Sequence, residues 1–290
     1  MTDLCSSSRA PLDRLQLQDA VRGLPLGRLW LEAESGSTNT ELAALAESGA
    51  AGHLSVYCTE YQSAGKGRLG RTWSTPAGSA LTLSVLAGPG ADMPAESLSW
   101  YTMLAAVALV QAIEQQAGVQ TAIKWPNDLL AGGKKACGIL AQLVSTPDGF
   151  AVVVGTGLNV DQAQDELPVP TATSLRLAAG RPVDRQQLLA GYLRTFAELD
   201  AAFAAVRGNA LAPLGLAAHP GASLHQLVAG SLATLGTEVR VEFPDDTVFE
   251  GIAEALAPDG GLLVRGSAGA VRHVLAGDVH HVRRADGKYA

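Results

Sequence analysis

The stretch that most constrains the fold is residues 60–73, a basic, glycine-rich loop between two segments of alternating apolar and polar residues. The alternating apolar residues are Leu54, Val56 and Cys58 before the loop, and Leu81, Leu83 and Val85 after it. Because alternation with a period of two indicates a strand, the loop is expected to join two strands of one sheet. A rigid frame of this kind is a common place for a functional loop.

The loop itself combines three glycines with Lys66, Arg68 and Arg71. Glycines let backbone N–H groups approach a ligand closely, and the basic side chains suit a phosphate or a carboxylate. The loop is not a P-loop, because Gly67 follows Lys66, and it is not a dinucleotide fingerprint, because no helix follows it. A solvated basic loop is the alternative interpretation.

Helical segments are expected on either side of this region. Residues 36–39 open a helix in which Thr38 and Glu41 fit a capping box and Gly49 fits the position after the last turn. Apolar spacing predicts further helices at 97–117 and 184–206, with a weaker one at 11–22. Hairpin signals at Gly132-Gly133 and Pro147-Asp-Gly149 indicate that much of the sheet is antiparallel.

The texture of the chain changes near Thr234. Short alternating segments separated by Pro-Asp-Asp, Pro-Asp-Gly-Gly and Gly-Ser-Ala-Gly turns predict a small all-β, barrel-like module. The expected fold is therefore α+β: a mixed sheet with helices packed on it over residues 1–232, followed by a β domain over 233–290.

Composition narrows the function classes. The 290 residues carry a net charge of −7, so general nucleic-acid binding is not expected and positive charge must be local to matter. Cys5, Cys58 and Cys137 are widely spaced and indicate reduced thiols. No secretory signal is apparent, and the longest apolar run, Met103–Val110, is too short to span a membrane. A cytoplasmic protein is expected.

The clustered polar residues favour phosphate chemistry. The available cations are Lys66, Arg68, Arg71, Lys124 and Lys135. Cations in a closed site stabilise charge on phosphate oxygens, and Asp128 could orient a lysine or a Mg²⁺ ion. Trp73 could stack on a base, although an aromatic beside a strand is more often part of the core.

Five motifs, in order and spacing, resemble those of biotin protein ligases. They are Gly36-Ser-Thr-Asn39, Glu60-Tyr-Gln-x-x-Gly-Lys-Gly-Arg-x-Gly-Arg-x-Trp73, Lys124-Trp-Pro-Asn-Asp128, Lys135-x-x-Gly-Ile-Leu140 and Gly155-x-Gly-Leu-Asn159. The resemblance covers about residues 12–284 and implies a class II synthetase-like catalytic domain followed by an SH3-like domain.

The resemblance also implies substrates and residue roles: activation of biotin by ATP with Mg²⁺, then transfer to a carrier lysine. The implied biotin contacts are Ser37, Thr38, Asn39, Gln62, Lys66, Gly67, Arg68 and Lys135. The implied ATP contacts are Arg68, Arg71, Trp73, Lys124, Asn127, Asp128, Lys135 and Asn159. Lys135, Arg68 and Asp128 are the implied catalytic residues, and no metal ligand is assigned. Lys66 stands where the family frequently has arginine, which puts bidentate contacts in doubt there.

The implied partner is a biotin carboxyl carrier protein, the acetyl-CoA carboxylase subunit, or another biotin-dependent carboxylase. A homodimer is kept as an alternative to a monomer. Specific DNA binding is not expected, because the 36 residues before Ser37 are too few for a three-helix DNA-binding unit. A lipoate–protein ligase of the related fold is the alternative enzyme, and a non-catalytic anion-binding module is the alternative outside enzymes.

Overall fold

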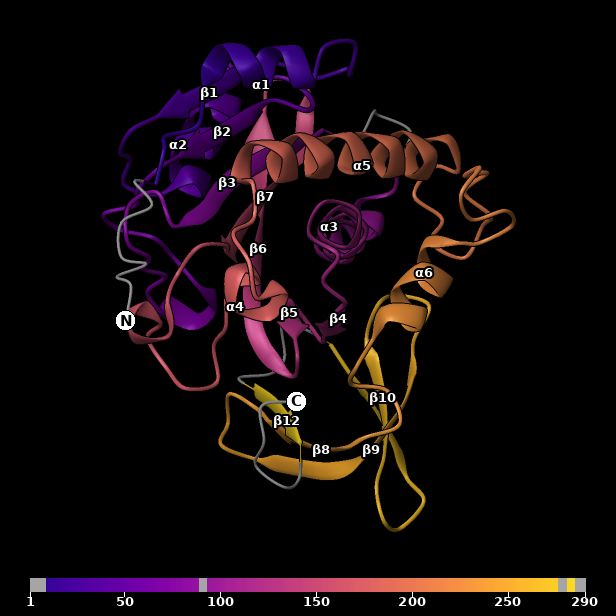
Figure 1. Ribbon diagram of the computed structural model, residues 1–290. Coiled ribbons are helices and arrows are strands. Elements are labelled where there is room, and N and C mark those ends of the chain that lie inside the picture. Colours follow the sequence, from indigo (N-terminus) through magenta and orange to yellow (C-terminus); the bar gives the residue numbers. More distant parts are fainter. Residues whose placement is uncertain (1–8, 89–92, 276–280, 285–290) are drawn as a thin grey trace.

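The computed structural model describes residues 9–88, 93–275 and 281–284, in which the chain builds two sheets (Figure 1). The larger has the strand order β1-β2-β3-β7-β6-β5-β4. Its strands are β1 Leu29–Glu32, β2 Val56–Thr59, β3 Ala80–Ala87, β4 Thr121–Lys124, β5 Asp128–Ala131, β6 Lys134–Thr146 and β7 Gly149–Asn159. The β1–β2 pair is parallel and the other neighbours are antiparallel, so the expected mixed sheet is confirmed.

The second sheet is small and antiparallel, with the order β11-β10-β9-β8-β12. Its strands are β8 Glu238–Glu242, β9 Val248–Leu256, β10 Leu262–Arg265, β11 Val271–Val274 and β12 His281–Arg284. The predicted C-terminal β module is therefore confirmed, and in Figure 1 it lies beyond the β4 side of the larger sheet. The exact boundary at 232/233 stays a prediction.

Helices cover both faces of the larger sheet. The helices are α1 Arg14–Ala20, α2 Thr38–Glu47, α3 Tyr101–Ala117, α4 Leu175–Ala179, α5 Arg185–Ala205 and α6 Leu224–Ser231, with 3-10 turns η1 Arg68–Gly70, η2 Ala95–Trp100 and η3 Gln164–Glu166. Apolar residues of α3 and α5 share one large core with β3 and β7. Helix α2 covers a smaller cluster on the opposite face, where Leu42 packs near Leu86 and Val153. The central strands are therefore packed between two helical layers.

Two predicted element boundaries differ from the structure. Leu54 lies outside β2 with a positive φ of 54°, and its N–H donates to the carbonyl of Leu86 across the loop. The helix expected at 97–117 begins instead as the 3-10 turn η2 and becomes α-helical at Tyr101. Gly118, in the left-handed region at φ 67°, ends it as expected.

Within the described residues, one helical segment, Ala95–Ala117, has the length and mean hydropathy to cross a membrane. Polar residues interrupt it, so it contains no apolar run of that length. In this structure 72% of the relevant window is buried, mainly as the core helix α3. The core of a soluble protein passes the same test, so the segment is weak support for a membrane span.

The C-terminal sheet is joined to the larger one through Trp125. Its indole N–H donates to the carbonyl of Gly260 at 3.0 Å, and its backbone N–H donates to the hydroxyl of Thr234 at 3.0 Å. Trp125 is 1% exposed and precedes Pro126 through a cis peptide bond. The C-terminal domain therefore directly contacts the segment that joins β4 to β5.

Candidate active site

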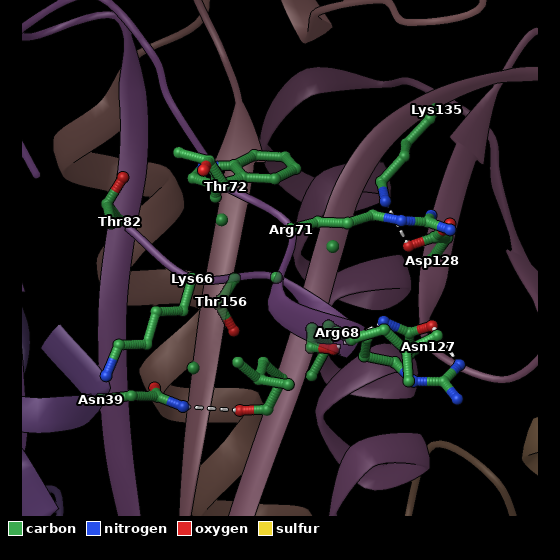
Figure 2. A pocket seen from close by; sticks show the side chains of 18 of the residues that line it. Asn39, Lys66, Arg68, Arg71, Thr72, Thr82, Asn127, Asp128, Lys135 and Thr156 are labelled. Carbon is green, nitrogen blue, oxygen red and sulfur yellow. Dashed lines mark hydrogen bonds and ion pairs between the residues drawn. The ribbon is translucent and has the colours of Figure 1, made fainter. Parts of the chain in front are cut away.

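A cavity of about 590 Å³ opens between the basic loop and strands β5, β6 and β7 (Figure 2). Of the fourteen residues for which the sequence suggested a role, it brings thirteen together. They are Ser37, Thr38, Asn39, Gln62, Lys66, Gly67, Arg68, Arg71, Trp73, Lys124, Asn127, Asp128 and Lys135. Asn159 does not line the cavity. The motifs scattered along the sequence thus converge on one site.

One end of the cavity, here called the neutral end, is built from the start of α2 and the middle of β3. The Gln62 Oε1 atom accepts from the backbone N–H of Thr38 at 2.8 Å and from its hydroxyl at 3.2 Å. The buried Ser84 hydroxyl lies 2.8 Å from Thr38 Oγ1. The predicted capping box of Thr38 and Glu41 is therefore wrong: Ser37 is the N-cap residue, and tertiary partners take the Thr38 side chain.

Asn39 is fixed at both ends of its amide. Its Nδ2 donates to the carbonyl of Leu140 at 2.9 Å, and its Oδ1 accepts from Ser84 at 2.6 Å. The fit depends on Gly155, where an added Cβ would lie 2.0 Å from Asn39 Oδ1. One amide hydrogen and one lone pair of Asn39 stay available, so it can present a single defined polar pattern to the cavity.

The other end, here called the charged end, centres on an ion pair between two neighbouring strands. Lys135 Nζ on β6 lies 2.6 Å from Asp128 Oδ1 on β5, and Figure 2 shows Arg71 extending towards the same pair. Both paired side chains are largely buried, at 27% and 14% exposure. Within the described lining of the whole cavity Asp128 is the one carboxylate, against five Lys and Arg residues, of which Lys66 turns towards the other end.

Arg68 reaches this end from the basic loop. Its Nη1 donates to Asn127 Oδ1 at 3.4 Å, and Asn127 Nδ2 donates to the carbonyl of Ile139 at 2.9 Å. Burial lowers the pKa of the Arg68 guanidinium, the nearby Asp128 opposes that shift, and Arg71 adds to it. An arginine held in a poorly solvated place beside another cation is well placed to bind an anion.

The basic loop closes on itself as a short hairpin. Trp73 N–H donates to the carbonyl of Gly65 at 2.9 Å, and Gly67 N–H donates to the carbonyl of Arg71 at 2.7 Å. Gly65 is required sterically, because an added Cβ would lie 2.3 Å from the Trp73 carbonyl. Lys66 turns towards the neutral end (Figure 2), where its Nζ donates to Thr40 Oγ1 at 3.0 Å.

The Trp73 ring lies close to two glycines and is not part of the apolar core. An added Cβ would approach its ring to 2.5 Å at Gly157 and 3.4 Å at Gly138. Lys135 Nζ lies 5.7 Å from the ring centroid. The indole N–H is buried with no acceptor among the described residues. This ring therefore offers a face and a donor beside the charged end.

Asn159 lies behind the cavity wall. Its Nδ2 donates to the carbonyl of Thr173 at 3.0 Å, and its Oδ1 accepts from Gln162 at 3.1 Å. Thr173 in turn donates its N–H to the carbonyl of Lys135. The adenine contact implied for Asn159 stays a prediction, and in this structure its connection to the cavity runs through the segment that pairs with Lys135.

Sequence reasoning missed several residues that shape the site. Ser84 lies in no motif, Gly155 and Gly157 belong to a motif but had no role assigned, and Leu69 and Val169 were not considered. Leu69 and Val169 line the cavity while staying 54% and 49% exposed. The alternation of glycines at 155 and 157 was the one available signal, since glycine in a strand often marks a close approach.

No group of three or more His, Cys, Asp or Glu side chains suited to a metal gathers in the described parts of the chain. A Mg²⁺ ion that arrives with a nucleotide needs only one or two carboxylates, because phosphates and waters complete its shell. Asp128 meets that requirement as an oxygen donor at the charged end. Among the described residues the donor set therefore fits a nucleotide-bound Mg²⁺.

Two parts of the chain match known protein families. Residues 34–159 match the Biotin/lipoate A/B protein ligase family, and residues 234–282 match the Biotin protein ligase C terminal domain. The biotin protein ligase of Aquifex aeolicus, in a solved structure in complex with biotin and ATP, has the same fold. Its TM-score is 0.72 with 24% identity, and the match covers 89% of this chain and 99% of that one.

Two relatives align over most of their length. The biotin–[acetyl-CoA-carboxylase] ligase of Mycobacterium tuberculosis is 38% identical over 283 residues, which is 95% of this chain and 97% of the relative. The enzyme of the same name from Paracoccus denitrificans is 36% identical, covering 82% of this chain and 94% of the relative. From these matches, the chain belongs to the biotin protein ligase family.

Proposed function

We propose that this protein activates biotin with ATP to form biotinoyl-5′-AMP, and then transfers biotin to one lysine of a biotin carboxyl carrier protein. The observation that supports the proposal most directly is that one cavity contains both the neutral end and the charged end. A neutral hydrogen-bonding end lies beside an end where cations outnumber carboxylates, within a chain of net charge −7. An uncharged polar ring with a carboxylate tail, next to a triphosphate, has this distribution of charge.

The first step joins two anions. The biotin carboxylate attacks the α-phosphorus of ATP, the bond to the β-phosphate breaks, and diphosphate leaves. Lys135 supplies an ammonium between the two reacting groups, and Asp128 orients it through the 2.6 Å ion pair. Cations fixed in advance stabilise the charge that develops in the transition state more than they stabilise the separate substrates. Mg²⁺ held through Asp128 would supply further neutralisation of the phosphates.

The neutral end is assigned to the biotin ring. Thr38, Asn39 and Gln62 are tied to one another or to strand carbonyls, so their remaining donors and acceptors are fixed before a ligand arrives. Fixed groups lose little conformational entropy on binding. Lys66 and Arg68 are assigned to closing the basic loop over the intermediate, since an acyl phosphate must be kept from water.

The second step is aminolysis. The amine of the carrier lysine attacks the acyl carbon of biotinoyl-AMP, an amide forms, and AMP leaves. The mixed anhydride is the more reactive partner, so no cysteine is needed. Burial raises the pKa of Cys58 to about 12 and raises that of Cys137 as well, and neither thiol lines the cavity. We infer that the enzyme does not bind nucleic acids in general, because the chain carries a net charge of −7.

The test uses the full chain with biotin, MgATP and an isolated carrier domain. Diphosphate release that depends on biotin, together with a single labelled lysine, is the expected result. Lipoate is the matched alternative substrate, because a lipoate ligase of the related fold would release diphosphate with lipoate and not with biotin. The two relatives that align over most of their length are named as biotin ligases, so the lipoate alternative is not favoured. Absence of biotin-dependent diphosphate release would overturn the proposal.

A further inference from the structure

Residues 9–12, here called the N-terminal brace, bind two separate segments that border the cavity. Arg9 lies against residues 161–173, here called the acidic loop. Its Nε atom is 3.2 Å from Asp161 Oδ2, and its Nη2 atom lies 2.5 Å from Glu166 Oε2 and 3.1 Å from the Asp161 carbonyl. One guanidinium thus holds two points of the loop, five residues apart.

The Arg9 contacts are well shielded. The side chains of Arg9 and Asp161 are 21% and 14% exposed. Glu166 also accepts from the Ala163 N–H at 2.8 Å, so its carboxylate closes the 3-10 turn η3. The Arg9 hydrogen bond lowers the pKa of Glu166 and the same contact raises the pKa of Arg9. A shielded arginine fork with two carboxylates is worth more than an exposed ion pair.

The acidic loop then leads directly to Lys135. Its Thr171 carbonyl accepts from the Lys135 N–H at 2.8 Å, and its Thr173 N–H donates to the Lys135 carbonyl at 2.8 Å. Val169 and Thr171 of the same loop line the cavity. The loop is therefore both the neighbour of the Lys135 backbone and part of the wall at the charged end.

The other end of the brace contacts the base of the basic loop. The N–H of Leu12 donates to Glu60 Oε1 at 2.6 Å, and Arg185 joins Glu60 Oε2 to the Ala10 carbonyl at 2.8 Å each. Glu60 begins the basic, glycine-rich stretch. A short segment far from the reacting groups in sequence thus holds both loops that frame the cavity.

We propose that Arg9 is a positioning residue that keeps the acidic loop in the conformation that supports Lys135 and the nucleotide. This assignment rests on the proposed function for its kinetic consequence. Without Arg9, the loop must be ordered each time a nucleotide binds, so binding weakens while the bound state reacts normally. At the neutral end, the hydrogen bonds given above for Thr38 and Asn39 do not involve the acidic loop. Biotin binding there should therefore be unaffected.

The test compares Arg9→Ala with Arg22→Ala. Arg22 pairs with Asp19 in the same N-terminal region, but that pair is 80% and 68% exposed and touches neither loop. Arg9→Ala should raise KM for ATP about tenfold, as for loss of a charged hydrogen bond, with kcat and the biotin KM within about twofold. Arg22→Ala should change none of these. Arg9→Lys should recover part of the loss, because it keeps the charge without the fork.

Amide hydrogen exchange in the ligand-free protein provides a readout that needs no activity. Exchange across 163–172 should quicken in Arg9→Ala and not in Arg22→Ala. Glu166→Gln, which leaves the N-terminal brace intact, should give the same pattern and serves if Arg9→Ala does not fold. Unchanged exchange in that segment, or equal rises in both substrate KM values, would overturn the role of Arg9. Failure of the wild type to release diphosphate would instead refute the proposed function, while the exchange result would still decide the brace.

Discussion

The two ends of the cavity are prepared for ligands in opposite ways. At the neutral end, Thr38, Asn39, Gln62 and Ser84 form a network with donor–acceptor distances of 2.6–3.2 Å and without net charge. At the charged end, cations outnumber the single carboxylate among the described lining residues. The first arrangement consists of neutral groups bonded to one another, whereas the second has more positive than negative side chains, which suits an anionic ligand. Changes at the neutral end should therefore affect recognition, and changes at the charged end should affect chemistry.

The sharpest test of this comparison is Lys135→Ala. Removing an ammonium that acts on the developing charge should lower the adenylation rate by on the order of 10²–10³-fold, as for other fixed electrostatic donors. The measurement is biotin-dependent diphosphate release under single-turnover conditions. Lys134→Ala is the control, because Lys134 is the exposed neighbour on the opposite face of β6. Similar losses in both variants would mean that general positive charge, and not Lys135, drives the reaction.

The charged end was largely predictable from sequence. At the neutral end the motifs indicated Thr38, Asn39 and Gln62, but not Ser84, which holds two of them in place. The cations and Asp128 sit in compact motifs whose order indicated a shared site. The neutral end depends on the register of β3 and β7, which places Ser84 opposite Gly155 and so leaves room for the Asn39 amide. Pairing between strands about 70 residues apart is set by the tertiary fold and leaves no local signal.

The helix start shows the same limit on a smaller scale. Thr38 and Glu41 have the spacing of a capping box, and local reasoning therefore predicted one. In the structure Gln62 and Ser84 bond to Thr38 instead, and Ser37 takes the N-cap position without a side-chain cap. Tertiary hydrogen bonds replaced a local one because the helix start forms part of the cavity.

The second prediction concerns Arg68, which extends from the basic loop to the charged end. Arg68→Gly removes the fork that holds the phosphate while leaving Lys135 in place, so some adenylation should persist. Retention of biotinoyl-AMP should fall about 10–100-fold, as for loss of one or two charged hydrogen bonds. The variant should then label lysines of an added bystander protein such as serum albumin. A variant that labels the carrier domain alone would contradict the role given to Arg68.

The third prediction concerns Gly155, which borders Asn39 at the neutral end. An added methyl group would lie 2.0 Å from Asn39 Oδ1, so Asn39 must leave its bonded position. Gly155→Ala should raise KM for biotin by roughly tenfold and reduce the free energy of unfolding by about 1–3 kcal/mol through overpacking. Gly157→Ala is the matched variant, because its methyl group meets the Trp73 ring at 2.5 Å instead. Gly157→Ala should raise KM for ATP. A rise in the biotin KM in both variants would contradict the assignment of different substrates to the two ends.

The smallest effect, and the finest test, is expected from Ser84→Ala. Ser84 is fully buried and does not line the cavity, so it acts on a ligand only by fixing Asn39 and Thr38. Loss of its hydroxyl leaves Asn39 Oδ1 without its donor, and the amide is then free to turn.

Because the substrate and the transition state use the same ring contacts, this loss should weaken both equally. KM for biotin should rise about 5-fold to 10-fold, with kcat and the ATP KM within about twofold, which is the pattern of lost uniform binding. Ser55→Ala is the control: Ser55 is equally buried and its hydroxyl accepts from the Arg28 N–H at 3.1 Å, away from the cavity. Equal effects of the two variants on the biotin KM would show that the change in KM comes from lost stability and not from the lost orientation of Asn39.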